Sequence, residues 1–139
     1  MAEVEVAGIR FTVREDLRYT DTDEWVRIED GVATVGITDY AQKKLRDIVS
    51  VELPEERAYK RGEVAAVVES IKATGEVYAP LDGEVVEVNE RLLDEPELVN
   101  ADPYGDGWIF KMKPSNPAQV EDLLSPEAYI ESVKRREGA

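Results

Sequence analysis

The chain has 139 residues and a hydrophobic fraction of 42%, which suits one compact domain with a buried core. Lysine and arginine number 17 against 31 aspartates and glutamates, and the formal net charge is −14. This negative field repels phosphate backbones and anionic lipids, so we expect neither nucleic acid nor a membrane as a partner. The N-terminal sequence lacks a basic region followed by a long apolar run, and we expect a cytoplasmic monomer.

The sequence contains no cysteine and no histidine. The first absence excludes disulfides, zinc–thiolate sites and thiol nucleophiles, and the second removes the commonest general base and metal ligand. A Ser/His/Asp or Cys/His catalytic arrangement is therefore excluded. We expect a protein that holds no metal and is not itself an enzyme.

The first predicted elements are two strands and a helix. Residues 24–28 (EWVRI) and 31–37 (GVATVGI) are rich in β-branched residues and flank an Asp-Gly pair, which is typical of a β-hairpin. The next segment, 38–45 (TDYAQKKL), begins with Thr38, a good N-cap residue. We therefore expect a short helix directly after the first hairpin.

More strands follow this helix. Residues 48–54 (IVSVELP) alternate, which places Val49, Val51 and Leu53 together on one face. Three further segments rich in valine and other strand-forming residues continue the pattern, and the second is interrupted by a proline and an Asp-Gly pair. They are 62–70 (GEVAAVVES), 75–88 (GEVYAPLDGEVVEV) and 107–114 (GWIFKMKP).

Lys72 lies in the short polar segment between two of these strands. A glycine-containing polar segment between β-branched runs indicates a hairpin, and Lys72 would project from its tip. An amine on a rigid, exposed turn suits the attachment of a group-carrying cofactor such as lipoate or biotin. The alternatives are an ordinary exposed lysine and a Schiff-base lysine. The second alternative needs an apolar pocket, against which the polar neighbours Ser70 and Thr74 argue.

The C-terminal part predicts helices. Asn116 with Pro117, and Ser125 with Pro126, each place an N-cap residue before a proline at the first helical position.

The strand pattern predicts a flattened β-barrel or sandwich whose tip presents one side chain. We divide the chain into an N-terminal extension (1–18), a core (19–114) and a C-terminal helical segment packed on the core (115–139).

Several segments resemble one family in order and spacing. They run from about Tyr19 to Tyr129, and together they resemble the H protein of the glycine cleavage system. The segments GITDYAQ and DPYGDGW are specific to that family, whereas a lysine hairpin such as VVESIKA is shared by all lipoyl and biotinyl domains. Biotin domains usually flank their lysine with methionines, which Ile71 and Ala73 do not match. The other matching segments are EWVRI, GVATVGITDYAQ, GEVVEVNERL, PELVNADPYGDGW and KMKPSNP.

The resemblance implies a fold of the lipoyl/biotinyl type (a barrel-sandwich hybrid) and a lipoate attached to Lys72. It implies a non-catalytic carrier that takes an aminomethyl group from the pyridoxal-phosphate glycine decarboxylase to a tetrahydrofolate-dependent aminomethyltransferase. A dihydrolipoyl dehydrogenase then reoxidises the dithiol, and a lipoate ligase or lipoyltransferase attaches the cofactor.

Three glutamates are candidate site residues. By their positions in the family pattern, Glu24 and Glu76 are expected to bind the cationic cargo, although both would equally fit plain surface charge. Glu69 lies at the end of a strand three residues before Lys72, and we expect it to mark the turn for a basic surface of the ligase.

The chain departs from the family pattern in three places. Asp23 stands where relatives commonly have histidine, Arg46 stands where they commonly have glycine, and the loop at 54–62 is shorter by one residue. These departures bear on the local cleft and on partner docking. Two readings besides glycine cleavage therefore stay open, namely an H-type lipoyl carrier for sulfur oxidation or lipoyl relay, and an unmodified β domain.

Overall fold

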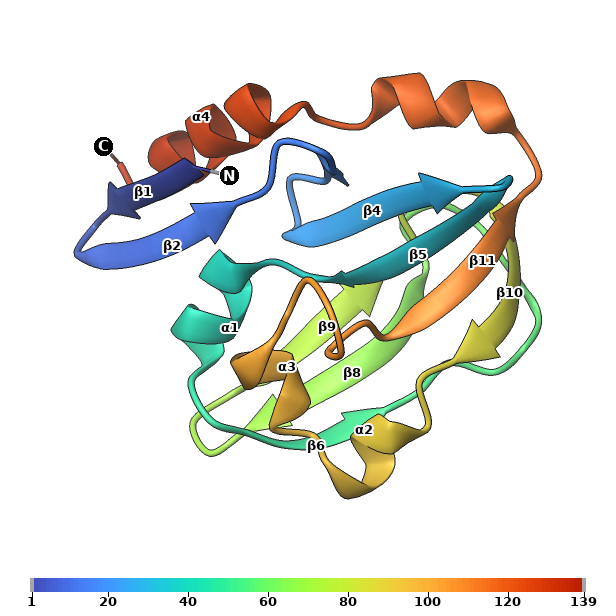
Figure 1. Ribbon diagram of the computed structural model, residues 1–139, viewed down its shortest axis with the longest axis horizontal. Helices are drawn as coiled ribbons and strands as arrows, with labels where there is room; N and C mark the ends of the chain where they lie inside the picture. The colour runs from blue at the N-terminus through green and yellow to red at the C-terminus, as the bar shows by residue number, and fades with distance from the viewer. Residues whose placement is uncertain (1, 139) are drawn as a thin grey trace.

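The computed structural model describes residues 2–138, and its architecture is mainly β (Figure 1). The strands are β1 (Ala2–Val6), β2 (Ile9–Val13), β3 (Arg18–Tyr19), β4 (Glu24–Glu29), β5 (Val32–Ile37), β6 (Ile48–Glu52), β7 (Ala58–Tyr59), β8 (Val64–Ser70), β9 (Thr74–Tyr78), β10 (Gly83–Val88) and β11 (Phe110–Pro114). The helices are α1 (Asp39–Leu45), α2 (Arg91–Asp94), α3 (Leu98–Ala101), a 3-10 helix (Pro117–Asp122) and α4 (Pro126–Arg136).

The strands form three antiparallel sheets. The six-stranded sheet has the order β3-β4-β5-β11-β10-β7, the three-stranded sheet has the order β6-β8-β9, and β1-β2 is a separate hairpin. The 3-10 helix and α4 run along one side of the molecule, and α1 lies below the β1-β2 hairpin (Figure 1). The predicted β fold with a short helix after the hairpin of residues 24–37 is confirmed, whereas the β1-β2 hairpin that precedes it is not among the predicted elements.

The helix α1 forms where its capping residues predict. Thr38 has an extended backbone, and its hydroxyl accepts a hydrogen bond from the amide of Ala41. Asp39 lies in the first turn and Lys43 in the last, which complements the helix dipole. The helix ends at Arg46, whose φ of 68° lies in a region that glycine adopts more readily.

The predicted alternation along 48–54 is wrong at Val49. The pairing of β6 with β8 shifts register between Ile48 and Ser50, as at a β-bulge. Because the bulge adds one residue, Ile48 and Val51 turn inward and Val49 is 53% exposed. Leu53 is half-buried, as the pattern predicts.

The C-terminal part is helical, but its two predicted helices differ. Ser125 caps α4 by accepting a hydrogen bond from the amide of Ala128, as expected. The segment after Asn116 forms a 3-10 helix instead of an α-helix, and the Asn116 side chain makes no capping hydrogen bond. Within residues 2–138, no helix is long and apolar enough to cross a membrane.

Two hydrophobic cores hold the sheets and helices together. The first lies between the two larger sheets and includes Val68, Val85 and Met112. The second lies beneath the β1-β2 hairpin and α4. It consists of apolar and aromatic side chains, namely Val6, Phe11, Val13, Leu17, Tyr19, Trp25, Tyr40, Tyr104, Tyr129 and Val133. The N-terminal extension and the C-terminal segment therefore share a core with β4, and the division into three parts stays an interpretation.

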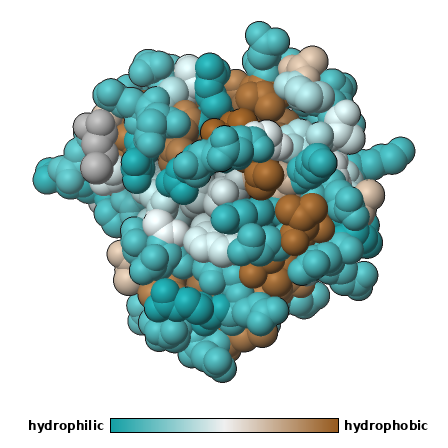
Figure 2. Space-filling view, turned by 45° about the vertical axis from the view of Figure 1, so that its right-hand side comes forward, coloured by the Kyte–Doolittle hydropathy of each residue, from teal (hydrophilic) through white to brown (hydrophobic). Residues whose placement is uncertain are grey.

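Trp25 illustrates how closely the second core is packed. Its indole Nε1 donates to the carbonyl of Pro103 at 2.9 Å, and a Cβ added to Gly36 would lie 2.6 Å from that same nitrogen. Glycine at this position therefore lets the ring lie flat on β5. On the face shown in Figure 2, several hydrophobic areas lie among mainly hydrophilic side chains.

Candidate functional site

The β8-β9 hairpin holds Lys72 at its tip, as predicted. Glu69 pairs with Thr74 at the end of the ladder. Ser70 closes the turn, because its amide donates to the carbonyl of Ala73 at 2.8 Å while its hydroxyl accepts from the amides of Lys72 and Ala73. The turn is therefore fixed by the backbone and by one short side chain.

The Lys72 side chain itself is exposed. Among the described residues, no hydrogen bond or ion pair engages its Nζ. The neighbouring Ile71 amide donates to the carbonyl of Asp47 at 3.1 Å, which ties the turn to the chain before β6. A free amine on an anchored turn is accessible to a modifying enzyme.

A pocket of about 340 Å³ lies beside this hairpin, next to its turn, and we call it the hairpin groove. It is lined by α1, by the parts of β8 and β9 that adjoin the turn, by Thr22 and Asp23, and by the end of α4. A Cβ added to Gly75 would lie 3.1 Å from Cδ1 of Leu45, so glycine at this position lets Leu45 pack closely against β9. Its apolar lining comes from Ile37, Ala41, Leu45, Val68 and Val77.

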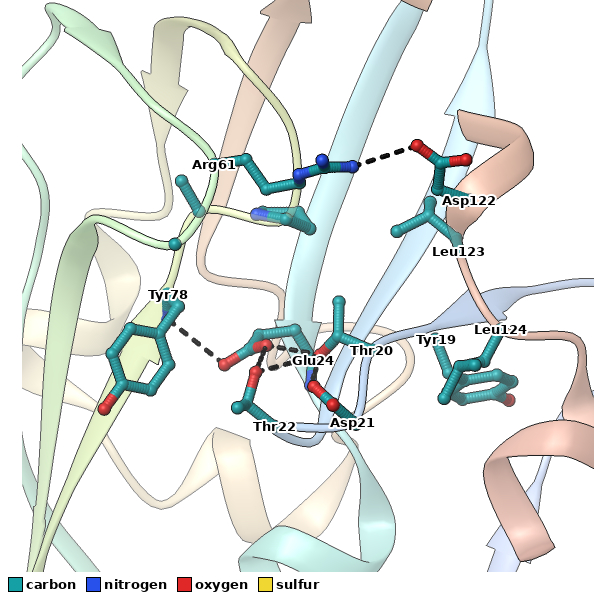
Figure 3. A pocket seen from close by; sticks show the side chains of 13 residues that line it. Tyr19, Thr20, Asp21, Thr22, Glu24, Arg61, Tyr78, Asp122, Leu123 and Leu124 are labelled. Atoms are coloured by element: carbon teal, nitrogen blue, oxygen red, sulfur yellow. Dashed lines mark hydrogen bonds and ion pairs between the residues drawn. The ribbon is translucent and has the colours of Figure 1, made fainter. Parts of the chain in front are cut away.

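A second pocket of about 430 Å³ surrounds Glu24, and we call it the carboxylate pocket (Figure 3). Thr22 lines both pockets. Arg61 and Asp122 form an ion pair of 3.1 Å across the pocket from Glu24 (Figure 3). The charged and titratable groups that line the carboxylate pocket are thus the buried carboxyl of Glu24, the exposed Asp21 and one ion pair.

Glu24 is buried, with 1% of its surface exposed, so it is not plain surface charge. Its carboxylate accepts hydrogen bonds from the hydroxyls of Thr20 and Thr22 and, at 3.1 Å, from the amide of Tyr78 (Figure 3). Burial raises the pKa of the Glu24 carboxyl to about 7, although these three hydrogen bonds work in the opposite direction. Near neutral pH this side chain exists in both protonation states.

The other two glutamates are exposed. Glu76 lines the hairpin groove and accepts a hydrogen bond of 3.0 Å from the hydroxyl of Tyr78. Tyr78 therefore contacts both candidate carboxylates, Glu24 through its amide and Glu76 through its hydroxyl. Glu69 lies on the exposed side of β8, where the hydroxyl of Ser50 donates to it at 3.2 Å.

Sequence reasoning missed the hydrogen-bond partners of Glu24. Thr20, Thr22 and Tyr78 carry no motif, because the turn at 20–24 and the end of β9 meet only in the folded chain. The spacing of Thr20, Thr22 and Glu24 at alternate positions is the one signal present in the sequence.

The three departures from the family pattern lie in ordered contacts. Asp23 accepts hydrogen bonds from Arg136 and Tyr129, and Arg46 ends α1 in the positive-φ conformation described above. In the 54–62 loop, the guanidinium of Arg57 stacks 3.8 Å from the ring centre of Tyr59.

Comparison with known proteins places the chain in a family. Residues 17–136 match the family model described as "Glycine cleavage H-protein". The chain belongs to the glycine cleavage H-protein family. It is 67% identical over 135 residues to the probable glycine cleavage system H protein of Aeropyrum pernix, covering 96% of this chain and 94% of the relative. Identity to the Thermotoga maritima H protein is 59% over 115 residues, covering 82% of this chain and 93% of the relative.

A solved structure agrees with this assignment. The crystal structure of a glycine cleavage system H protein from Mycobacterium marinum is 36% identical in sequence and superposes with a TM-score of 0.80. The match covers 87% of this chain and 98% of that one. The expected fold is thereby confirmed.

The burial of Glu24 generates a prediction about stability and pH. The folded-state pKa of about 7 lies above the ordinary value of 4.5, so folding favours the protonated acid. The contribution of protonated Glu24 to the stability of the fold is complete below pH 4.5 and is lost as the pH rises through 7. Relative to Glu24→Gln, we expect the free energy of unfolding to fall by about 2 kcal/mol between pH 5 and pH 8. Urea denaturation at several pH values measures this difference.

The matched control is Glu76→Gln, which removes an exposed carboxylate that also accepts from Tyr78. The free energy of unfolding of Glu76→Gln should change with pH in the same way as that of the unsubstituted protein. If Glu24→Gln also changed with pH in that way, the assignment of a raised pKa to Glu24 would be contradicted.

Proposed function

We propose that this protein is the lipoylated carrier of the glycine cleavage system, with lipoate attached through an amide to Nζ of Lys72. It moves the aminomethyl group from glycine decarboxylase to the tetrahydrofolate-dependent aminomethyltransferase. Family membership supports the role. The observation that carries the attachment site is the Lys72 amine, which has no partner among residues 2–138 and stands on an anchored turn beside the hairpin groove.

The residues around Lys72 fit this cofactor. When bound, lipoate supplies the two sulfurs that accept and release the carried group. The chain offers an apolar lining for an aliphatic arm in the hairpin groove, chiefly from Leu45 and Val77. A side chain larger than hydrogen at position 75 would narrow that space. The sequence has no histidine or cysteine to perform the chemistry, so the protein's part is to bind, orient and protect.

Two carboxylates suit a cationic cargo. Glu76 lies on the wall of the hairpin groove, and Glu24 lies in the adjoining carboxylate pocket, with Thr22 on the border of both. An ammonium group beside a buried carboxylate makes a charge-assisted hydrogen bond that solvent does not weaken. We assign Glu24 the main role, since it is buried and already oriented by three donors.

The charge of the chain bears on its partners. The net charge of −14 favours basic docking surfaces on the enzymes that the carrier visits. Under this proposal they are glycine decarboxylase, the aminomethyltransferase, dihydrolipoyl dehydrogenase and the lipoate ligase or lipoyltransferase. Glu69 is the candidate contact for the last of these, because it is exposed three residues before Lys72.

Lipoylation should be confined to Lys72. After incubation with lipoate and a lipoate ligase, intact-mass spectrometry should show one added lipoyl group in the unmodified sequence and none in Lys72→Arg, which lacks a primary amine at the tip. Lys60→Arg, in an exposed loop, is the control and should be modified normally. A lipoyl amide on Lys72→Arg would refute the assignment. Reconstitution with glycine decarboxylase then tests the pathway.

Glu69→Ala should slow lipoylation by about fivefold through a lower association rate. Its melting temperature should stay nearly unchanged, because the side chain is exposed and its one hydrogen bond is to Ser50. The rate of modification is followed by mass spectrometry over time. Glu52→Ala, an exposed carboxylate on the neighbouring strand β6, is the control. Loss of stability with normal modification would reverse the role given to Glu69.

The double variant Glu24→Gln with Glu76→Gln should shorten the lifetime of the carried group. Losing a carboxylate beside a cation removes about 1 kcal/mol, which corresponds to a several-fold change in occupancy. Release of ammonia and formaldehyde from purified, loaded protein measures that lifetime. Lipoylation and first loading should stay close to normal. An unchanged release rate would remove both glutamates from the binding role without affecting Lys72.

A further inference from the structure

Asp23 connects the turn at 20–24 to the last turn of α4. Its carboxylate accepts hydrogen bonds from Nη1 and Nη2 of Arg136 at 3.1 and 2.9 Å. It also accepts from the hydroxyl of Tyr129 at 2.8 Å. The Asp23 side chain is 19% exposed, and the forked geometry of arginine fixes both its distance and its orientation.

The backbone of Asp23 makes further connections. Its carbonyl accepts from the amide of Thr38, the N-cap of α1, at 2.9 Å, and its own amide donates to the carbonyl of Thr20. The hydroxyls of Thr38 and Tyr129 are 2.7 Å apart and share a hydrogen bond. Asp23 therefore joins the turn, α1 and α4, although 113 positions separate it from Arg136.

The backbone conformation of Asp23 requires such support. Its φ is 73°, in the left-handed region that residues other than glycine seldom occupy. Aspartate and asparagine tolerate this region better than most residues, yet it persists only where surrounding contacts hold it. The hydrogen bonds of Asp23 to Arg136, Tyr129 and Thr38 provide these contacts.

The turn that Asp23 supports carries the donors to Glu24. Thr20 and Thr22 precede Asp23 in this turn, and both donate to the Glu24 carboxylate. The amide of Thr20 also donates to the carbonyl of Glu24. A shift of the turn would therefore move both hydroxyl donors relative to the carboxylate. Asp23 and Arg136 in addition line the hairpin groove, so they form part of its wall.

We propose that Asp23 is a positioning residue which, held by Arg136 and Tyr129, fixes the turn at 20–24 and thereby the carboxylate of Glu24. We call Asp23, Arg136 and Tyr129 the clasp. The use of that carboxylate for a cationic cargo rests on the function proposed above. The positioning itself does not, because it concerns hydrogen bonds within the unmodified chain. The competing view is that the ion pair only stabilises the docking of α4.

Amide hydrogen exchange separates these views. The amide of Tyr78 donates to the Glu24 carboxylate, and the amide of Glu24 donates to the hydroxyl of Thr20, so both report on the turn. In Arg136→Gln, measured by NMR on the full unmodified chain, we expect both amides to exchange about tenfold faster. Amides away from the turn, such as that of Val85 in β10, which donates to the carbonyl of Arg57, should exchange as before.

Two further variants sharpen the experiment. Arg136→Lys keeps the charge but loses the fork, and it should give an intermediate exchange rate. Asp16→Asn removes another two-bond pair, formed with Arg14 away from both pockets, and should leave the Tyr78 amide unchanged. Unchanged exchange at Tyr78 in Arg136→Gln would overturn the proposal. An equal acceleration of all core amides would also overturn it, since that result means only global destabilisation.

A second measurement addresses the cargo. In lipoylated and loaded protein, Arg136→Gln should release ammonia several-fold faster than Asp16→Asn. Faster release supports the role of the clasp in holding the cargo, and unchanged release alongside faster Tyr78 exchange overturns that role. Failure of every variant to accept lipoate would overturn the proposed function alone, because the exchange experiment uses the unmodified chain.

Discussion

The site depends on a carboxylate that is buried between two sheets. Glu24 begins β4 of the six-stranded sheet, and it accepts a hydrogen bond from Tyr78 at the end of β9 in the three-stranded sheet. Taking a carboxylate out of water is unfavourable unless hydrogen bonds replace its hydration. The donors around Glu24 do so only while the turn at 20–24 and the end of the hairpin keep their places. The need of the buried Glu24 for hydrogen-bond donors thus ties β4 of the six-stranded sheet to β9 of the three-stranded sheet.

The β8-β9 hairpin combines a fixed turn with an exposed side chain at its tip. Ser70 and the carbonyl of Asp47 fix the turn, whereas the Lys72 side chain extends into solvent without a partner among the described residues. A carrier needs this combination, because partners must find the lysine at a constant place while the attached arm changes its position. Under the function proposed above, the apolar lining of the hairpin groove is where that arm would lie.

Features that depend on neighbouring residues could be predicted from the sequence. Thr38 and Ser125 cap their helices as expected, and the polar turn before Gly75 places Lys72. Features that depend on distant contacts could not. The bulge that exposes Val49 is a property of the β6-β8 pairing. The burial of Glu24 likewise needs Tyr78, which lies 54 positions further along the chain, so its sequence context could not distinguish it from the exposed Glu76.

Glu24 also gives the molecule a titrating group near neutral pH, which its composition does not predict. A chain without histidine lacks the side chain that normally changes charge near neutral pH, yet the pKa of about 7 places Glu24 in that range. Near pH 7 the acid is therefore present in both protonation states. Under the function proposed above, a cation bound beside Glu24 favours the ionised form, so binding would be coupled to release of a proton. Acidification would then favour release of the cargo.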